Sequence, residues 1–447
     1  MLAVDSAVPS RIERKLKSFA PDLIGITSTT DQFPLAKKLV VSLSRSARVP
    51  IILGGIHATV RPEECVAMPG VTAVCIGEGE GAIQDIVECL ENGGSLHTIP
   101  NLWVRRPDGS VAKNEVRPLI EDLDTLPFPD RDLFEYRSIL CGQAEGFEVM
   151  ASRGCPFYCS FCMNHKLKEL YRGKGEFVRF RSAKNVTEEI SSQIHRFPEA
   201  TYVTFHDDTF NSNKEYLREL CERYARTVRL PFRCNVRADL VDEETISLLK
   251  MANCDVMWIG VEAGSDYIRN QVLRKGVSRD QLLRAFQLAR NAGIKTRAFN
   301  MIGSPGETRE DIVETIHLNQ ILSPEELPVP TIFRPYPGTL LYEYCAERGW
   351  ISSRATQGYG DSSILKQPSV SARKLDYLQE VFPYAARQIR MLPLFKVLAF
   401  LRARRAYERL PDVIKNLLRG PLNLLRRPPR GRMAHKDKGT VRDVNRC

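Results

Sequence analysis

Hydrophobic runs alternate with amphipathic segments along the first ninety residues of the chain. Three short apolar runs, each ending in small or glycine residues, lie at residues 23–27, 51–53 and 71–76. Segments with apolar residues at helical spacing follow two of them, at 34–43 and 82–90. Strands that alternate with helices are typical of a parallel sheet with crossover helices. The pattern therefore predicts an α/β domain with a partial Rossmann-like parallel sheet over residues 1–94.

A second series of strands and helices begins near residue 147. Its strands are expected at 147–152, 202–206, 232–236, 256–261, 296–302 and 330–334. Apolar residues at helical spacing mark the segments between them, at 183–195, 214–226, 243–252, 279–292 and 309–320. Six such units predict a (β/α)6 partial TIM barrel over residues 147–345, with its chemistry at the carboxyl ends of the strands.

The two series are separated by residues 95–146, which differ in character. A β-hairpin is expected at 103–113 around a Pro-Asp-Gly turn, followed by an extended connector at 126–130. We therefore expect a linker with a hairpin of its own. Residues 346–447 are expected to form a helical, basic C-terminal extension that ends in a disordered tail.

Length and composition exclude several classes of protein. A chain of 447 residues with 43% hydrophobic residues is long enough for two or three domains with real cores. No apolar stretch approaches the roughly 18 residues of a membrane span, and the first residues do not resemble a secretion signal. The chain is therefore expected to be cytoplasmic, with reduced thiols. Its 12 cysteines are too few and too scattered for a disulfide scaffold, so a cluster among them points to metal binding or catalysis.

The net charge of +10 is concentrated at the C-terminal end. Beyond Met391 there are 15 Lys and Arg residues against 4 Asp and Glu, so the rest of the chain is nearly neutral. A basic nucleic-acid-binding surface is not expected. Leu394, Val397, Leu398 and Leu401 fall on one helical stripe beside several arginines. Such a basic amphipathic segment suits either ordinary packing on the barrel or, over residues 391–432, the anionic inner face of a membrane.

Three cysteines in one loop carry the most specific chemical signal. Cys155, Cys159 and Cys162 directly follow the first strand of the second series. Three thiolates can hold three irons of a cubane cluster and leave the fourth iron open for chemistry. A zinc site that adds His165 is the alternative, but structural zinc requires a closed shell in a small module. The aromatic residues before the second and third cysteines, with a barrel behind them, favour the cluster.

With this C-x3-C-x2-C spacing, and with Phe161 before the last cysteine, the chain resembles the radical S-adenosylmethionine (SAM) enzymes. The resemblance implies a 4Fe-4S cluster on Cys155, Cys159 and Cys162, which are then the catalytic residues. Its open iron would chelate the amino and carboxylate groups of SAM, and an electron would cleave SAM to methionine and a deoxyadenosyl radical. An electron donor such as flavodoxin or ferredoxin is implied as a partner.

Segments after the later barrel strands resemble the SAM-binding segments of that family. In addition to Phe161, the residues expected to bind SAM are Asp207, Asp208, Glu262, Ser265, Gly303 and Arg334. The two aspartates would face the methionine amino group, because a carboxylate accepts hydrogen bonds from an amine. Glu262 and Ser265 would contact the ribose, and Gly303 would flank the adenine. Helix capping, turn formation and simple salt bridges remain alternatives for these positions.

The first domain resembles the cobalamin-binding domain of cobalamin-dependent radical SAM enzymes. The similarity rests on residues 21–28, 54–59 and 77–80. It implies cobalamin contacts at Ser28, Thr29, Gly54, Gly55, His57, Gly77 and Glu78. The serine and threonine would contact the nucleotide tail, and the double glycine would let it pass close to the backbone. We favour a tail-side or structural role for the histidine over a role as cobalt ligand, because it follows the double glycine.

This sequence departs from the cobalamin-binding pattern at its start. Residues 2–5 resemble the end of the second strand of the usual five, so the first strand, its helix and the loop under the cobalt are missing. No D-x-H-x-x-G motif occurs in the chain. Either Met1 is not the true start of the protein, or the domain is incomplete. Cobalamin binding is therefore a weaker expectation than SAM binding.

The sequence thus predicts a radical SAM enzyme that acts on a small-molecule substrate. The favoured reaction is hydrogen-atom abstraction from an unactivated carbon followed by methyl transfer from methylcobalamin. One alternative is a non-methylating cyclisation, oxidation or rearrangement of a lipid, isoprenoid or tetrapyrrole-like substrate; an apolar substrate would fit a membrane-bound enzyme. A second alternative is a non-catalytic regulatory protein that binds the cluster and cobalamin.

Overall fold

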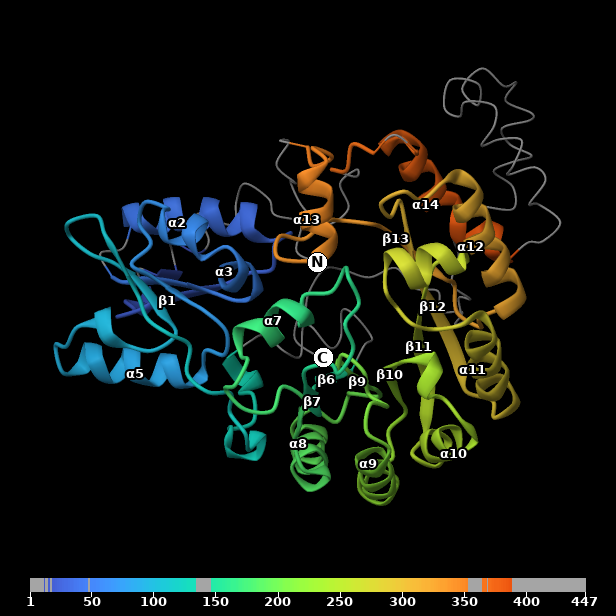
Figure 1. Cartoon of the computed structure of the whole chain (residues 1–447). Coiled ribbons are helices and arrows are strands. Elements are labelled where there is room, and N and C mark those ends of the chain that lie inside the picture. Colours follow the sequence, from blue (N-terminus) through green and yellow to red (C-terminus); the bar gives the residue numbers. More distant parts are fainter. Residues whose placement is uncertain are drawn as a thin grey trace, which may run out of the picture.

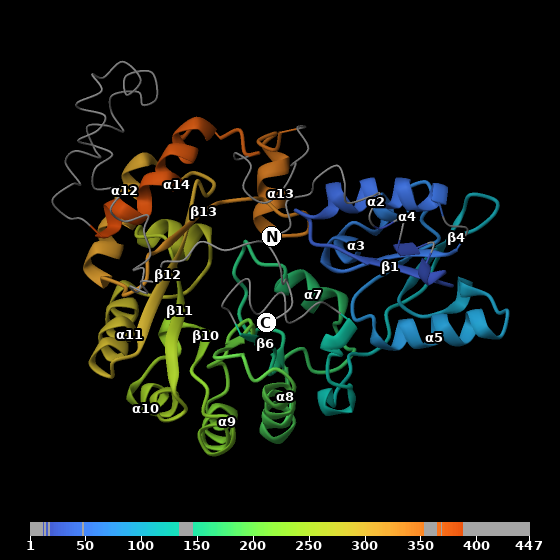
Figure 2. The same cartoon turned by 180° about the vertical axis from the view of Figure 1, so that it is seen from behind.

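The computed structural model describes Ile12 and residues 15–16, 18–46, 49–133, 146–352, 364–367 and 369–387. Two α/β units lie side by side (Figures 1 and 2). The first contains a five-stranded sheet and the second a six-stranded parallel sheet with helices along its outer side. In the part of the chain that the structure describes, no helix is both long and apolar enough to span a membrane.

The first sheet has the strand order β1-β2-β3-β4-β5. Strands β1 (Ile24–Thr27), β2 (Ile51–Gly54) and β3 (Ala73–Cys75) are parallel and correspond to the three predicted apolar runs. The hairpin of β4 (Leu102–Arg105) and β5 (Val111–Lys113) forms as predicted. It does not stand apart as a linker element, because β4 pairs antiparallel with β3. The hairpin thereby covers an edge of β3 that would otherwise be unpaired.

Helices of the first unit pack on this sheet through their apolar faces. They are α2 (Phe33–Ser46), α3 (Ile56–Val60), α4 (Pro62–Val66) and α5 (Glu80–Glu91). Phe33, Ala36, Val40 and Leu43 of α2 recur at helical spacing and are buried in one core cluster with residues of β1 and β2. The strand predicted at residues 2–5 lies outside the described residues.

The second sheet has the strand order β13-β12-β11-β10-β9-β6, and all its strands are parallel. The strands are β6 (Phe147–Val149), β9 (Val203–Phe205), β10 (Phe232–Val236), β11 (Cys254–Glu262), β12 (Lys295–Ile302) and β13 (Val329–Ile332). Each pairs with its neighbour in the chain order, so the sheet curls into the partial barrel that the sequence predicts (Figure 1).

Helices cover the outer face of the partial barrel (Figure 2). They are α8 (Ala183–Arg196), α9 (Lys214–Thr227), α10 (Glu243–Met251), α11 (Arg279–Asn291) and α12 (Arg309–Leu322). Each begins at a side chain that caps it, as Ser182 accepts from the backbone N–H of Asn185 at the start of α8. The main core fills the space between these helices and the sheet, with Phe205, Tyr224 and Phe232 at its centre.

Several elements were not predicted from the sequence. The expected strand at 147–152 divides into β6 and β7 (Ser152–Arg153), and β7 pairs with β8 (Arg179–Phe180) in a separate two-stranded sheet. Helix α7 (Asn164–Leu170) directly follows the cysteine loop. A π-helix spans Tyr267–Val272, and α13 (Leu340–Glu347) follows the last strand. Helix α14 (Ala372–Arg387) lies within the segment 346–447 that was expected to be helical. The basic segment 391–432 lies outside the described residues.

Candidate functional site

The cysteine loop begins where β7 ends, at the carboxyl edge of the partial barrel. Gly154 opens it in a left-handed conformation, and a Cβ there would collide with the carbonyl oxygen of Phe177. Cys155, Cys159 and Cys162 are partly buried thiols. A tight turn joins the last two, since the amide of Cys162 donates to the carbonyl of Cys159 at 3.1 Å. The loop therefore presents three thiols from one short segment, as the sequence predicts.

Ser160 fastens this loop to two other elements. Its hydroxyl donates to the carbonyl of Val272 at 2.6 Å, and its amide donates to the carbonyl of Leu273 at 3.0 Å. Its own carbonyl accepts from the amide of Leu341 in α13 at 3.1 Å. These bonds tie the position after Cys159 to the π-helix and to α13. The cysteines are thus held by buried contacts at their backbone.

Two buried cations lie beside Cys159. Arg237 donates toward its sulfur at 3.8 Å, and its guanidinium also lies over the Phe157 ring, 3.5 Å from the centroid. Lys275 is the second cation and is mostly buried. Burial raises the pKa of Cys159, while the charges of Lys275 and Arg237 act in the opposite direction. Burial raises the pKa of Cys162 to about 11. Metal coordination deprotonates such thiols, and the two cations then stabilise the negative charge on them.

These residues fit an open-iron cluster better than zinc. In the described ranges no three His, Cys, Asp or Glu side chains converge on a position where they could hold one metal ion. A zinc ion requires such convergence, whereas a cubane cluster takes each thiolate on a different iron. His165, the proposed fourth zinc ligand, places Nδ1 2.7 Å from the carbonyl oxygen of Cys162. Its ring is thereby engaged with the backbone of the loop.

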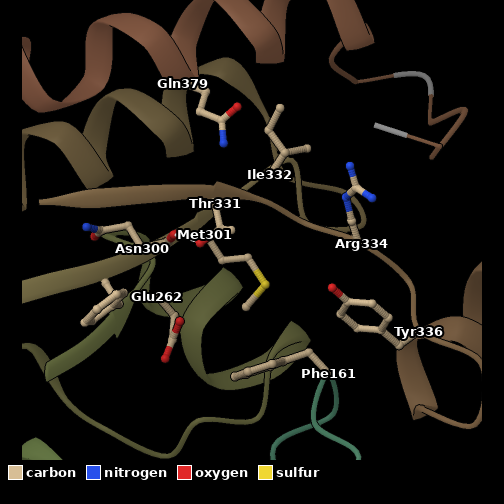
Figure 3. Close-up of a pocket in the computed structure, with 10 residues that line it drawn as sticks. Phe161, Glu262, Asn300, Met301, Thr331, Ile332, Arg334, Tyr336 and Gln379 are labelled. Carbon is tan, nitrogen blue, oxygen red and sulfur yellow. Dashed lines mark hydrogen bonds between the residues drawn. The ribbon is translucent and has the colours of Figure 1, made fainter. Parts of the chain in front are cut away.

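A cavity of about 270 Å³ opens beside Phe161, the residue before the last cysteine (Figure 3). It is lined by Phe161, Glu262, Phe299, Asn300, Met301, Thr331, Ile332, Arg334, Tyr336 and Gln379. Three of these, Phe161, Glu262 and Arg334, are residues that the sequence predicts to bind SAM. They come from the cysteine loop and from the ends of β11 and β13, so the fold brings together segments that are far apart in the sequence.

Glu262 has an unusual backbone and a fixed side chain. It is in a left-handed conformation (φ 63°) at the end of β11, where the register with β12 shifts. Its carboxylate forms an ion pair with Lys275 at 2.8 Å. Gly260 leaves room for this pair, because a Cβ there would lie 2.6 Å from the lysine Nζ. Non-glycine residues with positive φ persist where the surroundings over-determine them, which is common at functional sites.

The two adjacent aspartates lie in different environments. Asp207 is buried and accepts from the amide of Ala151 at 3.1 Å and from the hydroxyl of Ser152, and burial raises its pKa to about 6. It therefore ties β6 and β7 to the end of β9. Asp208 is exposed and accepts from the side chain of Asn164 at 3.1 Å. Asp208 is accordingly the better placed of the two to meet an amine.

Ser265 and Gly303 are not among the residues that line the cavity. Ser265 is buried and accepts from the amide of Ile268 at 3.5 Å, as a residue that caps the π-helix. Gly303 is left-handed, and its Cβ would lie 2.6 Å from the side chain of Leu375 in α14. Its amide donates to the buried carboxyl of Glu307. These contacts correspond to the capping and turn roles that the sequence left open.

Arg334 is part of a contact between the two units. Its guanidinium pairs with Asp31 at 3.0 Å, and the hydroxyl of Tyr336 donates to the other oxygen of the same carboxylate at 2.6 Å. Asp31 lies in the loop between β1 and α2. A salt bridge was one alternative for Arg334, and the structure forms it while the side chain still lines the cavity.

The loops at the carboxyl edge of the first sheet contain the other predicted cobalamin residues. Ser28 is buried and its carbonyl accepts from the amide of His57 at 3.2 Å, whereas Thr29 is exposed. Gly55 is left-handed, and a Cβ would meet the hydroxyl of Thr27 at 2.6 Å. Gly54 is different, because nothing lies closer than 3.9 Å to its added Cβ. The contacts within the protein therefore require a glycine at position 55 but not at position 54.

His57 is buried and is held by a stacked aromatic ring and by a contact at one ring nitrogen. Its ring stacks on Phe33 with centroids 3.8 Å apart, and Nδ1 lies 3.2 Å from the hydroxyl of Thr30. Burial lowers its pKa to about 4, against the opposing charge of Glu64. A neutral, packed ring agrees with the structural role that we favour for this histidine.

Gly77 and Glu78 contact the barrel unit. A Cβ on Gly77 would collide with the hydroxyl of Tyr171, which accepts from the amide of Glu78 at 2.6 Å. The Glu78 carboxylate pairs with Arg179 at 2.7 Å and with Arg153 at 3.0 Å. Burial alone would raise the pKa of Glu78, but these hydrogen bonds hold it below its usual value. The two residues therefore join the units.

The contacts place the carboxyl edges of the two sheets opposite each other. Asp31 and Glu78 follow strands of the first sheet, and their partners lie beside the cysteine loop or the cavity. The sequence analysis did not identify Asp31, Arg237, Lys275 or Tyr336. Two of these, Arg237 and Tyr336, follow barrel strands, so their position in the pattern could have indicated them. Asp31 likewise follows a strand, β1 of the first sheet, whereas no such pattern exists for Lys275.

Two family models match the chain. The one described as the Radical SAM superfamily matches residues 149–318, and the one described as the B12 binding domain matches residues 1–87. The first match covers the barrel strands β9 to β12, and the second covers the three parallel strands of the first sheet.

Known relatives match over most of the chain. An uncharacterized methyltransferase of Pyrococcus horikoshii is 32% identical over 344 residues, 75% of this chain and 72% of the relative. The anaerobic magnesium-protoporphyrin IX monomethyl ester cyclase of Rubrivivax gelatinosus is 25% identical over 348 residues, 76% of this chain and 61% of that protein. The hopanoid C-3 methylase of Methylococcus capsulatus is 27% identical, with 73% and 61% covered. The chain thus spans about three fifths of the length of several relatives.

Solved structures share the fold. The radical SAM methyltransferase TsrM of Kitasatospora setae, with cobalamin and a [4Fe-4S] cluster bound, superimposes with a TM-score of 0.63 at 20% identity, covering 82% of this chain and 76% of TsrM. The cobalamin-dependent SAM radical enzyme OxsB with aqua-cobalamin gives a TM-score of 0.66 at 17% identity, covering 94% of this chain and 65% of OxsB. Both similarities extend over most of this chain.

Proposed function

Because the chain belongs to the radical SAM superfamily and carries a B12-binding domain before its barrel, we propose that it is a cobalamin-dependent methylase of an unactivated carbon. Its cofactors are a 4Fe-4S cluster, SAM and cobalamin. When bound, they supply a radical that removes a hydrogen atom from carbon and a methyl group that replaces it. The substrate is a small molecule.

The main support for this proposal is that the carboxyl edge of the first sheet lies opposite the carboxyl edge of the partial barrel. Ligands of open α/β sheets bind outside the carboxyl ends of the strands. In this protein that edge of the first sheet meets the cysteine loop through Glu78 and Arg153, and meets the cavity through Asp31 and Arg334. A group bound at one edge therefore faces a group bound at the other, as a methyl transfer between them requires.

The residues of the chain take defined parts in this scheme. Cys155, Cys159 and Cys162 hold the cluster, with Arg237 and Lys275 offsetting its negative charge. The SAM-binding assignments that the cavity supports are Phe161, Glu262 and Arg334, with Asp208 near the cluster loop. Ser28, Thr29, Gly54 and Gly55 form the cobalamin-facing loops. The barrel and α13 exclude water from the reacting centre.

The products of SAM separate the methylating reaction from its alternatives. The reconstituted protein is reduced anaerobically with SAM and cobalamin, and the adenosyl products are quantified by mass spectrometry. Methylation predicts deoxyadenosine together with cobalamin-dependent S-adenosylhomocysteine. Deoxyadenosine alone would favour the cyclisation, oxidation or rearrangement reaction, which the name of the cyclase relative also suggests. Absence of both would favour a non-catalytic protein that binds cobalamin and the cluster.

Two partners complete the proposal. The electron comes from a flavodoxin or ferredoxin, which is tested by replacing the chemical reductant with either protein. The basic segment 391–432 places the protein at an anionic membrane surface, where an apolar substrate would be reached. In a flotation assay, binding to anionic but not to neutral liposomes supports this location, and binding to neither contradicts it.

A further inference from the structure

Asp31 joins the two predicted cofactor sites through one buried carboxylate. One oxygen pairs with Arg334 at 3.0 Å, and the other accepts from the hydroxyl of Tyr336 at 2.6 Å. Both Asp31 and Arg334 have side chains that are only 8% exposed. Charge-assisted hydrogen bonds in such a shielded place are strong and directional. The contact therefore fixes the relative position of two loops that are about 300 residues apart in the chain.

A short turn holds Asp31 in this position. The side chain of Gln32 accepts from the amide of Thr29 at 3.1 Å, and the amide of Gln32 donates to the carbonyl of Thr29 at 3.1 Å. The neighbouring hydroxyl of Thr30 lies 3.2 Å from the ring of His57. The turn thereby contacts α3, the helix that follows β2. Movement of the loops at this edge of the first sheet must therefore displace Asp31.

On the other side, the partners of Asp31 form a wall of the cavity. Figure 3 shows Arg334 and Tyr336 on the same side of it, across from Glu262 and close to Phe161. Asp31 lies behind this wall and is not one of the lining residues. Its carboxylate binds both the guanidinium of Arg334 and the phenol of Tyr336 from the side away from the cavity. Any change in Asp31 should thus reach the cavity only through those two side chains.

We propose that Asp31 is a positioning residue that couples the two cofactor sites, so that cobalamin at the first sheet and SAM in the cavity increase each other's affinity. The inference rests on the proposed function, because it requires that both cofactors bind. Cobalamin that binds these loops in the arrangement seen here stabilises the contact of Asp31 with Arg334 and Tyr336, and with it the cavity wall that SAM meets. SAM against Arg334 and Tyr336 in turn fixes Asp31 and its turn.

Thermodynamic linkage makes this coupling reciprocal. If cobalamin multiplies the affinity for SAM by a factor, SAM must multiply the affinity for cobalamin by the same factor. For couplings of ordinary size the factor is about fivefold or more. A contact that only held the two units together would lower stability when it was removed. It would not by itself let either cofactor raise the affinity for the other, so both factors would be one.

The test is a pair of binding measurements on the reconstituted full chain with an oxidised cluster, so that SAM is not consumed. Equilibrium dialysis gives the dissociation constant of SAM with and without saturating hydroxocobalamin. Absorbance titration gives that of hydroxocobalamin with and without saturating SAM. We expect equal factors of about fivefold or more in the wild-type protein, and factors near one in Asp31→Asn.

Two further variants make the result specific. Tyr336→Phe removes only the hydroxyl that meets Asp31 and is expected to reduce both factors as well. Asp22→Asn, an exposed aspartate just before β1, is the matched control and should keep the wild-type factors. Wild-type factors of one, or factors that Asp31→Asn leaves unchanged, overturn the coupling while the proposed function stands. If the wild-type protein binds neither cofactor, both the coupling and the proposed function are contradicted.

Discussion

Glu78 and Arg153 are 75 residues apart in the chain, and their side chains form an ion pair of 3.0 Å at the junction of the two units. Arg153 stands two residues before Cys155, the first cysteine of the loop. Glu78 also pairs with Arg179, whose side chain is 6% exposed. One carboxylate of the first unit therefore supports the segment from which the cluster loop starts.

Replacing this carboxylate should loosen the cluster loop. Glu78→Gln leaves the buried guanidinium of Arg179 without its carboxylate partner, which typically costs about 3 kcal/mol, while Arg153 keeps its ion pair with Glu80. We expect a lower free energy of unfolding in urea, and faster hydrogen exchange at the amides around Cys155. Glu176→Gln, a change at an exposed site, is the control. Unchanged exchange in Glu78→Gln would show that the ion pair does not support the loop.

The same pair gives a pH dependence of known sign. Its partners hold the pKa of Glu78 below its usual value, so the folded state favours the ionised form. The stabilisation is full above the unfolded pKa of about 4.3 and is lost as the pH falls through the lower folded value. Acid unfolding of Glu78→Gln should therefore be less steep than that of the wild type.

Glu307 predicts a pH dependence of the opposite direction. Burial raises its pKa to about 8, although the backbone amides of Gly303 and Ser304 donate to it. The folded state then binds a proton that the unfolded state releases above about pH 4.3. Stability should fall as the pH rises from about 4.3 to about 8 and stay constant beyond it.

Glu307→Gln tests this assignment. The amide keeps the shape of the side chain and its acceptor oxygen, but it does not titrate. Urea unfolding at several pH values should show a decline between pH 5 and 8 in the wild type and a smaller decline in the variant. Equal slopes in the two proteins would mean that Glu307 is ionised in the folded state.

Substitutions at Gly54 and Gly55 can distinguish a structural role from a role in cobalamin binding. Gly55→Ala puts a Cβ 2.6 Å from the Thr27 hydroxyl at positive φ, and such strain costs about 1–3 kcal/mol. Gly54→Ala adds a Cβ with nothing closer than 3.9 Å and should leave the stability of the cofactor-free protein unchanged. If cobalamin passes close to this backbone, Gly54→Ala should still weaken hydroxocobalamin binding in an absorbance titration. Unaltered binding would place the cofactor elsewhere.

The cluster assignment predicts a selective loss in Cys159→Ala. Three thiolates are the full protein ligand set, so the variant should lose iron and reductive SAM cleavage while its far-ultraviolet circular dichroism stays the same. Cys89→Ser changes a cysteine outside the loop and is the control. Retention of iron and of deoxyadenosine formation by Cys159→Ala would exclude this ligand set.

The alternation of apolar runs and amphipathic segments correctly indicated both sheets, because parallel strands and their helices each produce a local period. The division of 147–152 into β6 and β7 has no such period; it depends on Asp207, which holds Ala151 and Ser152 from another strand. The pairing of the hairpin with β3 is likewise a long-range choice. The local sequence of the hairpin does not indicate that it pairs with β3.

The candidate site was predictable where its residues form a motif. The cysteine spacing and Phe161 located the loop, and strand ends located Glu262 and Arg334 beside the cavity. Lys275 and Asp31 belong to no motif and act through partners that only the fold brings near. Glu78 was predicted from its position to contact cobalamin, and the sequence did not indicate that its carboxylate pairs with the barrel arginines Arg153 and Arg179.

The central claim is that this chain transfers the methyl group of SAM by way of cobalamin. The most direct measurement uses SAM with a trideuterated methyl group and the reduced, reconstituted protein with cobalamin, followed by mass spectrometry of the recovered cobalamin. If methyl transfer proceeds by way of cobalamin, the recovered cobalamin carries the trideuterated methyl group, and an equal amount of S-adenosylhomocysteine is formed. Unlabelled cobalamin, recovered from a protein that retains both its iron and its cobalamin, would contradict it.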